Sequence, residues 1–200
     1  PAPLPVAAAA LGTSEVAAVS DAGRRGAVLE IRSELHDARA GHLLAAGIAR
    51  YLARGAGGFD AGPVARPAAV VLPSGEADLE LQIHTTPDQA VRYARLGDDN
   101  PIHLDAAAAR EAGFERPILH GLCSFGLVGC VLVTRGAMPG LSGLELDFRA
   151  PVFPGELLKL EAWRQGDGAL LRLTAPSRDG AILSLGRCFA RGAARSSGRG

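Results

Sequence analysis

The chain has 200 residues, of which 48% are hydrophobic and 21% are charged, a composition typical of a globular protein. This length fits one domain, or one and a fraction, at about 150 residues per domain. Twenty-one basic residues balance 21 acidic ones, so there is no basic excess to bind nucleic acid or an anionic membrane. The apolar run within residues 122–133 is too short to span a bilayer, which needs about 20 residues.

The cysteines indicate a reducing compartment. Cys123, Cys130 and Cys188 are an odd number in a chain too large to need disulfide bonds for stability. The first ten residues contain no cationic start followed by an apolar core, so no secretion signal is expected. We therefore expect a cytoplasmic protein, with Cys123 and Cys130 as core thiols.

The first 60 residues are predicted to form an antiparallel meander of three strands. Apolar residues alternate along each strand, and turn formers separate them. The predicted strands are 15–21, 27–36 and 43–54. Glycine and proline are then dense, so residues 61–73 are assigned to a linker.

The remainder, residues 74–191, is predicted to fold as an α+β domain. A strand at 79–85 is followed by a helix at 87–96, with Thr86 as its cap and Pro87 in its first turn. A short second helix follows, and then a helix at 121–134 that is apolar nearly all round and is expected to have protein on every side. The short second helix is predicted at 104–112, and the last predicted elements are the strands 141–149, 156–164, 169–175 and 181–190.

This order of elements suggests an antiparallel sheet curled around the central apolar helix. The tail, residues 192–200, is rich in Gly, Ser and Arg and is predicted to be disordered.

The loop after the first helix contains a candidate catalytic pair. We expect the helix to end at Gly97 and to deliver Asp98 to a loop, where Pro101 pushes Asn100 out of the α region. Asp98 and His103 would then face one space. A carboxylate and an imidazole held together can bind one water molecule, as general acid–base catalysis requires, and the amide of Asn100 could orient either group. Taken alone, such a pair is more often structural than catalytic.

A second candidate is Gly121, at the start of the apolar helix. The first amide N–H groups of a helix lack intrahelical partners, and the helix dipole is positive there, so Gly121 could receive an oxyanion. The alternative is that Gly121 only permits tight packing. His120 is expected to pack or to orient the loop. No cluster of residues has the spacing of a metal site, so no metal is expected.

Three segments in order resemble the MaoC-like, (R)-specific enoyl-CoA hydratases and dehydratases, whose fold is the hot-dog. They are YARLGDDNPIH at 93–103, RPILHGLC at 116–123 and FRAPVFPGE at 148–156. The resemblance covers residues 67–190. It implies reversible hydration of a trans-2-enoyl-CoA to the (R)-3-hydroxyacyl-CoA.

The resemblance also implies the roles of particular residues. Asp98 and His103 would activate the water and manage the α-proton, with Asn100 in a supporting position. The N–H of Gly121 would polarise the thioester carbonyl. No metal or redox cofactor is implied, because the polarised thioester already acidifies the α-position.

Residues 1–60 resemble only the final strands of the first, non-catalytic hot-dog repeat of two-domain members. A repeat that lacks its central helix would leave one apolar face uncovered. We expect a second copy or a partner chain to bury that face, giving a homo- or hetero-oligomer through the hot-dog sheet, or else the chain is part of a longer protein.

Three other functions stay open. The acyl group could be attached to acyl carrier protein instead of CoA, the chain could be a non-catalytic supporting subunit of a heteromeric dehydratase, or it could be a thioesterase of the same fold. The presence of Asp98, Asn100, His103 and Gly121 together disfavours a supporting subunit. The lack of an acyl-transfer nucleophile disfavours a thioesterase.

Overall fold

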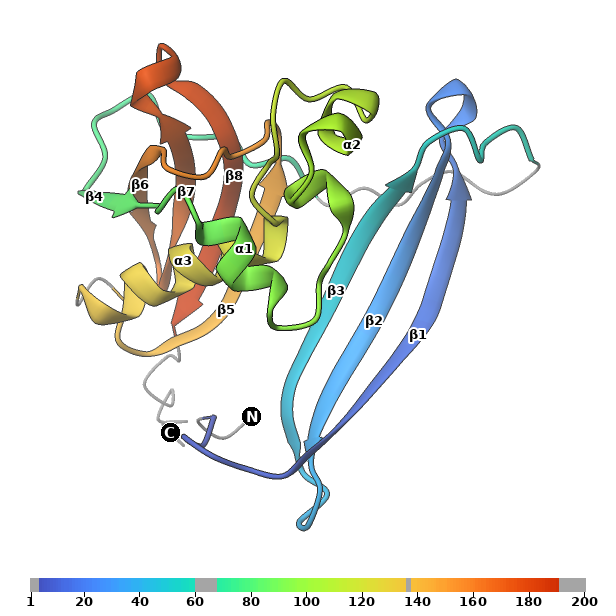
Figure 1. The fold of residues 1–200 in the computed structure, drawn as a ribbon. Coiled ribbons are helices and arrows are strands. Elements are labelled where there is room, and N and C mark those ends of the chain that lie inside the picture. Colours follow the sequence, from blue (N-terminus) through green and yellow to red (C-terminus); the bar gives the residue numbers. More distant parts are fainter. Residues whose placement is uncertain (1–3, 60–67, 136–137, 191–200) are drawn as a thin grey trace, which may run out of the picture. The chain divides into compact units, whose positions relative to one another are not determined.

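The computed structural model describes residues 4–59, 68–135 and 138–190 (Figure 1). The chain divides into two compact units, Pro1–Ala68 and Ala69–Gly200. This division falls within the segment predicted to be a linker. Most of that segment and the tail at 192–200 lie outside the described residues, so the predicted linker and disordered tail stay predictions. No helix in the described ranges is long and apolar enough to cross a membrane.

The first unit is a three-stranded antiparallel sheet in the order β1–β2–β3. Its strands are β1 Ala10–Asp21, β2 Ala27–Asp37 and β3 Leu43–Ala53. All three predicted strands are present, and β1 begins five residues earlier than expected. Within residues 4–59 the unit contains no α-helix, only a 3₁₀ turn, η1, at Gly23–Arg25.

One face of this sheet is apolar. The register aligns Val19, Leu29 and Tyr51 as cross-strand neighbours on that face. A β-bulge between Val16 and Ala18 returns Val16 to the same face as Val19, because the extra residue shifts the two-residue alternation. Tyr51 remains 54% exposed and Val16 58%. The apolar face is therefore largely uncovered.

The opposite face of the same sheet contains ion pairs together with apolar residues such as Ile48 and Leu52. Arg32 pairs with Glu15 at 3.5 Å, and Arg50 pairs with Glu30 at 2.7 Å. Exposed pairs of this kind contribute little to stability. The sequence alternation thus places the ion pairs on the face opposite Val19, Leu29 and Tyr51.

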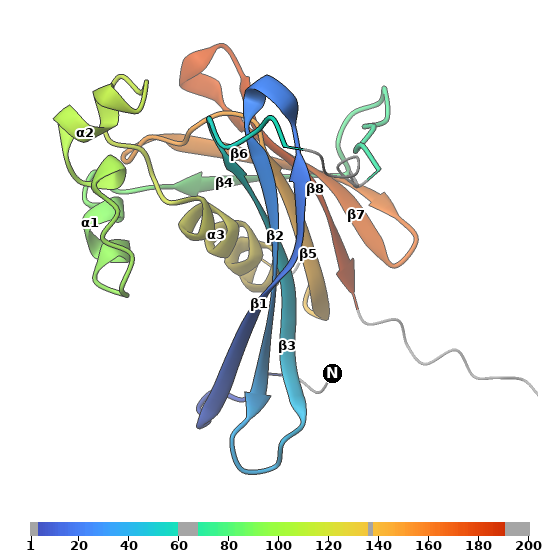
Figure 2. The same ribbon diagram turned by 90° about the vertical axis from the view of Figure 1, so that its right-hand side faces the viewer.

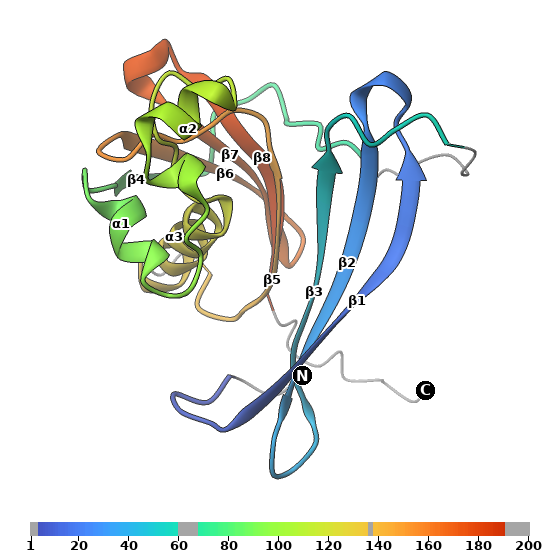
Figure 3. The same cartoon turned by 45° about the vertical axis from the view of Figure 1, so that its right-hand side comes forward.

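The second unit is a five-stranded antiparallel sheet in the order β4–β6–β7–β8–β5, with the helix α3 along one face (Figures 2 and 3). The short helices α1 and α2 lie on the same side of the sheet as α3 (Figure 2). The elements are β4 Leu79–His84, α1 Gln89–Ala94, η2 Pro101–His103, α2 Ala106–Glu111, α3 Gly121–Thr134, β5 Leu141–Phe148, β6 Leu157–Gln165, β7 Gly168–Ala175, η3 Pro176–Arg178 and β8 Ala181–Ala190. This arrangement confirms the predicted hot-dog fold, and α3 has the predicted bounds.

The core of this unit lies between α3 and the sheet. Val128 and Leu132 from α3 pack with the inward-facing leucines of the central strands, and all are buried. These leucines are Leu158, Leu160, Leu171, Leu173 and Leu183. The alternation along β6 and β7 thus directs one residue in two toward the helix.

The prediction that protein surrounds α3 on every side is wrong. Leu122 is 57% exposed and Val133 is 43% exposed, and Cys130 is exposed rather than a core thiol. Cys123 is buried, as expected. The sheet can cover only one side of a helix, and the described residues leave much of the opposite side open. The apolar composition of α3 does not indicate on how many sides of the helix other residues pack.

The predicted cap of the first helix is also wrong. α1 begins at Gln89, two residues later than expected, and Thr86 gives its hydroxyl to the side chain of Asp88 at 2.5 Å instead of accepting from a helix N–H. The Gln89 N–H bonds the carbonyl of Thr86 at 3.0 Å. Residues 86–88 therefore form a turn before the helix.

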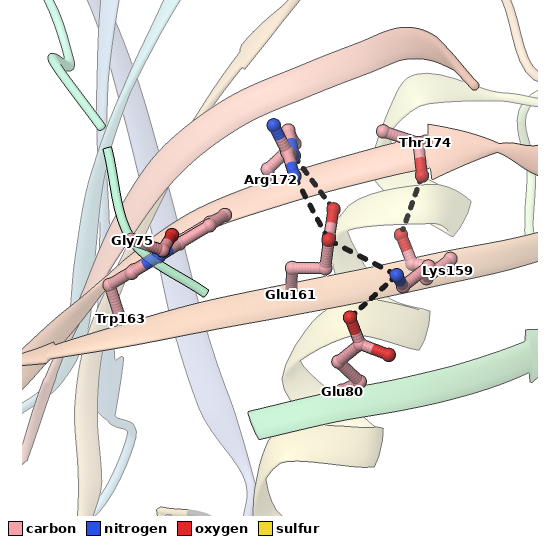
Figure 4. A network of polar contacts seen from close by, with 7 residues as sticks. All are labelled: Gly75, Glu80, Lys159, Glu161, Trp163, Arg172 and Thr174. Atoms are coloured by element: carbon pink, nitrogen blue, oxygen red, sulfur yellow. Dashed lines mark hydrogen bonds and ion pairs between the residues drawn. The ribbon is translucent and has the colours of Figure 1, made fainter. Parts of the chain in front are cut away.

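The face of the sheet away from α3 contains a charged network (Figure 4). Arg172 on β7 binds Glu161 on β6 with two hydrogen bonds of 2.7 and 2.9 Å. Lys159 pairs with Glu161 at 3.2 Å and with Glu80 on β4 at 2.6 Å. Arg172, followed by Lys159, lowers the pKa of the nearly buried Glu161 carboxyl, against the opposing effect of desolvation. The network cross-links three neighbouring strands.

Candidate active site

The loop between α1 and η2 places Asp98 and His103 on either side of a rigid turn. Gly97 has a φ of +107°, a conformation that glycine adopts without strain, and it directs the chain away from α1. Asn100 has φ −54° and ψ 121°, the extended conformation that a following proline imposes. Pro101 then opens η2, which ends at His103. The sequence prediction of a rigid turn is confirmed.

His103 is a nearly buried imidazole in a defined tautomer. Its Nδ1 lies 2.8 Å from the carbonyl oxygen of Ile118. A carbonyl can only accept a hydrogen bond, so Nδ1 donates, and in the neutral ring Nε2 keeps its lone pair. Burial lowers the pKa of His103, whereas the Ile118 carbonyl and the Asp98 carboxylate raise it. An imidazole with a lowered pKa is suited to act as a base near neutral pH.

Asp98, His103 and His120 form a cluster. One ligand-type atom from each residue lies within 4.8 Å of the other two, and Asp98 is exposed while both histidines are buried. The structure thus brings Asp98 and His103 together, although their catalytic roles stay predictions. Within the described ranges, this is also the one group of three such residues that could hold a metal ion.

The rings around this cluster are closely packed. His120 stacks on His103 with 3.8 Å between ring centroids and a 27° interplanar angle. Tyr93 lies 4.7 Å from His120, and burial raises the pKa of its phenol. His120 Nε2 lies 3.0 Å from the main-chain oxygen of Asp98. Asp98 and His103 are therefore linked through His120.

Gly121 follows His120 directly as the first residue of α3 and is exposed. Its N–H has no hydrogen-bond acceptor in the described part of the chain, as expected for the first turn of a helix. A β-carbon at this position would lie 3.4 Å from the Phe148 ring, so a larger side chain would press against that ring. Gly121 thus offers a free amide beside the cluster.

The segment before α3 is held by its neighbours. The N–H of Ile118 bonds the carbonyl of Ile102 at 3.3 Å, and the N–H of Leu119 bonds the carbonyl of Val152 at 2.7 Å. Val152 belongs to the loop before β6, where the buried Glu156 accepts from the Phe153 N–H at 2.8 Å. These bonds fix the Ile118 backbone, whose carbonyl accepts the hydrogen bond from His103 Nδ1.

An ion pair in turn supports that loop. Arg178 pairs with Glu156 at 2.7 Å and also donates to the Pro151 carbonyl at 2.8 Å. Arg116 and Arg178 both lie over the Phe153 ring, at 4.5 and 5.1 Å from its centroid. Sequence reasoning assigned no role to Glu156 or Arg178, because their pairing depends on a contact across 22 residues.

Asn100 caps the turn that leads to His103. Its side-chain oxygen accepts from the Ile102 N–H at 3.3 Å and caps η2. Asn100 has no side-chain hydrogen bond to Asp98 or to His103 within the residues described. It therefore shapes the turn, and its supporting role beside Asp98 and His103 stays a prediction.

A family model for the MaoC like domain matches residues 70–174. The chain is 38% identical over 186 residues to 3-hydroxyacyl-thioester dehydratase Y of Mycobacterium tuberculosis, which covers 90% of this chain and 64% of that protein. It is 32% identical to Enoyl-CoA hydratase 2, peroxisomal, of Arabidopsis thaliana, with 91% of this chain and 62% of that protein covered. The chain thus spans less than two thirds of these relatives.

A solved structure is similar over most of the chain. The crystal structure of a MaoC-like dehydratase from Phytophthora capsici matches with a TM-score of 0.79 at 29% identity. The match covers 90% of this chain and 64% of that one.

Proposed function

The chain belongs to the MaoC-like dehydratase family, and from this premise we propose that it adds water reversibly to a trans-2-enoyl-CoA to give the (R)-3-hydroxyacyl-CoA. The observation that supports this proposal most directly is the approach of the Asp98 carboxylate to the imidazole of His103, within 4.8 Å. The free Gly121 amide beside them supplies the third element that the reaction needs.

The proposed reaction begins with a water molecule between Asp98 and His103. The pair takes one proton from the water, and the water oxygen forms a bond to C3 of the enoyl group. The electrons of the C2–C3 double bond move onto the thioester oxygen, where the Gly121 N–H stabilises the developing charge. The proton held by the pair then passes to C2. Dehydration is the same sequence in reverse, and neither direction uses a metal or redox cofactor.

The state of His103 supports its role as the base. With Nδ1 donating to Ile118, the lone pair of Nε2 is the one available to the water. Because burial lowers the pKa of His103, the neutral form persists to more acidic pH than for an exposed histidine. Activity should therefore fall only below about pH 6.5, as His103 becomes protonated.

An assay of enoyl-CoA hydration tests the proposal. Crotonyl-CoA and a longer enoyl-CoA are compared in the parent, in Asp98→Asn and in His103→Ala. General acid–base catalysis contributes about 10²–10⁴-fold, so each change should lower kcat/KM at least about 100-fold. Asp88→Asn, at the start of α1, is a control that should keep parental activity, because Asp88 lies outside the cluster. Variants of Asp98 and His103 that keep most of the activity would exclude these roles.

The same assay separates the alternatives. A parent that acts on enoyl-acyl carrier protein but on neither CoA thioester would indicate the carrier-protein reaction. Inactivity on both kinds of substrate would favour a supporting subunit. Hydrolysis of the thioester, detected as free thiol, would favour a thioesterase.

We further propose that another hot-dog segment covers the apolar face of the first unit. Val16, Val19 and Tyr51 expose apolar side chains there, and large exposed apolar patches commonly mark interfaces. A second copy of the chain or a partner chain is the expected occupant. Light scattering after size exclusion tests this, since a well-behaved monomer with a folded first unit would contradict it.

We propose the cytoplasm as the compartment. The three cysteines are free thiols, which supports a reducing environment. Some relatives are named as peroxisomal proteins, so cell fractionation must distinguish the two compartments.

A further inference from the structure

His120 is a buried imidazole to which the proposed chemistry gives no task. Its side chain is only 1% exposed. It is the N-cap residue of α3, yet its side chain makes no capping hydrogen bond. Instead the ring meets Asp98, His103 and Tyr93, all at the candidate site. A buried side chain that contacts these three residues is a candidate for arranging the site.

The first of these contacts holds the Asp98 loop. The Asp98 carbonyl can only accept, so His120 Nε2 carries the proton and donates across 3.0 Å. Within the described residues the Asp98 carboxylate accepts no hydrogen bond. The carbonyl bond is therefore the one hydrogen bond that restrains Asp98 in the exposed loop. Losing it would free the carboxylate to move.

The second contact holds the ring of His103. Ile118 bonds one edge of that ring through Nδ1, and His120 covers one of its faces at 3.8 Å. A hydrogen bond at one edge still permits the ring to tilt about it, and the stacked ring opposes such tilting. The remaining nitrogen of His120, Nδ1, is buried and has no hydrogen-bond partner among the residues that the structure describes, so no competing polar contact there draws the ring away.

We propose that His120 is a positioning residue, which holds the Asp98 loop through its Nε2–H bond and the His103 ring by stacking against its face. One side chain thus sets the separation of the two groups between which the water is expected to lie. The kinetic part of this inference rests on the proposed hydration activity. A displacement of about 1 Å in such a geometry can lower the rate about 10²-fold.

His120 also influences the charge of His103. Burial has the largest effect and lowers the pKa of His103, while the neighbouring His120 lowers it further. The Asp98 carboxylate acts in the opposite direction. Removing the imidazole at position 120 should consequently raise the pH at which His103 titrates, which can be measured without any substrate.

Two substitutions separate the hydrogen bond from the stack. His120→Phe keeps an aromatic ring on His103 but removes the donor to Asp98. His120→Gln keeps an N–H donor at nearly the position of Nε2 but removes the ring. His42→Phe, in the exposed hairpin of the first unit, is the matched control. In the full chain, kcat, KM, the melting temperature and the NMR titration of His103 are measured for each.

We expect His120→Phe to lower kcat about 10²-fold with KM little changed, and His120→Gln to recover part of that loss through its donor. Both variants should change the NMR signals of His103 at a nearly parental melting temperature. The inference is overturned if both keep kcat within about twofold, if Gln is no better than Phe, or if activity falls only in step with the melting temperature.

Failure of this inference about His120 can be distinguished from failure of the proposed hydration activity. If the parent hydrates neither thioester, the hydratase proposal fails, and the NMR spectra of the two variants decide this inference through the positions of Asp98 and His103. Parental chemical shifts of both residues in both variants would then overturn it.

Discussion

The first and second units are built from the same kind of long, alternating antiparallel strand, but among the described residues the first unit has no α-helix of its own to pack on its sheet. In the second unit, the inward leucines of β6 and β7 meet Val128 and Leu132 of α3 and are buried. In the first unit, the corresponding apolar face contains Val16, Val19 and Tyr51, which remain exposed. Alternation in a sequence therefore specifies which face of a sheet is apolar, and another element must supply the burial.

The two units also differ in their polar chemistry. His103 of the second unit is nearly buried, and its imidazole is hydrogen-bonded to the carbonyl of Ile118. His36 of the first unit bonds Glu34 and the Gly41 carbonyl in a hairpin, and these bonds raise its pKa. Burial thus shifts one histidine toward the neutral form while hairpin contacts shift the other toward the charged form. Only the first behaviour suits a base near neutral pH.

The largest expected difference in stability comes from the core. Leu171→Ala should destabilise the second unit by about 2–5 kcal/mol, because it leaves a cavity among fully buried leucines. Leu52→Ala on the exposed sheet of the first unit should change stability by less than about 0.5 kcal/mol. Trp163, the one tryptophan of the chain, lies in the second unit, so its fluorescence during urea unfolding measures the first effect. Equal effects measured by circular dichroism would contradict the comparison.

The ion pairs of the two units should show a smaller difference in their effect on stability. Arg172→Gln removes two hydrogen bonds to the nearly buried Glu161 and should destabilise the second unit by about 1–3 kcal/mol at pH 7. Arg32→Gln, which breaks an exposed pair of the first unit, should have an effect below about 1 kcal/mol.

The pH dependence of the Arg172 effect has a definite sign. The pKa of Glu161 is lowered in the folded chain, so its ion pair stabilises the fold above about pH 4.5 and loses this effect as the pH falls further. The difference between Arg172→Gln and the parent should consequently shrink in acid. A difference that stays constant from pH 7 to pH 3 would show that the ion pair is not its source.

The smallest expected effect concerns a cap. Asp105 accepts from the Ala108 N–H at 2.7 Å and begins α2, so Asp105→Ala should reduce the stability of the second unit by about 1 kcal/mol. Asp37 makes similar bonds to Arg39 and Ala40 in a hairpin turn of the first unit. Asp37→Ala should not change the urea concentration at which Trp163 fluorescence reports unfolding. A shift of that transition would show that the two units unfold together.

The order of strands and helices followed from the sequence because each element has its own local pattern. α3 is the clearest case, with bounds of Gly121–Thr134 as predicted. What surrounds α3 could not be predicted, since an apolar helix can have neighbours on one side or on several. The start of α1 was also missed, because Thr86 had an alternative partner in Asp88.

The candidate site also has features that could be predicted from the sequence and features that could not. The turn that holds Asp98 near His103 depends on Gly97 and Pro101, whose backbone preferences are readable from the sequence. The bonds from His103 to Ile118 and from His120 to Asp98 join residues 15 and 22 positions apart. No local pattern encodes such contacts, and they appear only once the loop and the start of α3 are folded together.

The contact between Gly121 and Phe148 has a consequence for enzyme engineering. A methyl group at position 121 would be in van der Waals contact with the aromatic ring, 3.4 Å away, and a longer side chain would have to extend past that ring. A directed-evolution library that varies Gly121 alone would therefore depend on how far the Phe148 ring gives way. Trimming Phe148 in the same clones would open that region to larger substitutions.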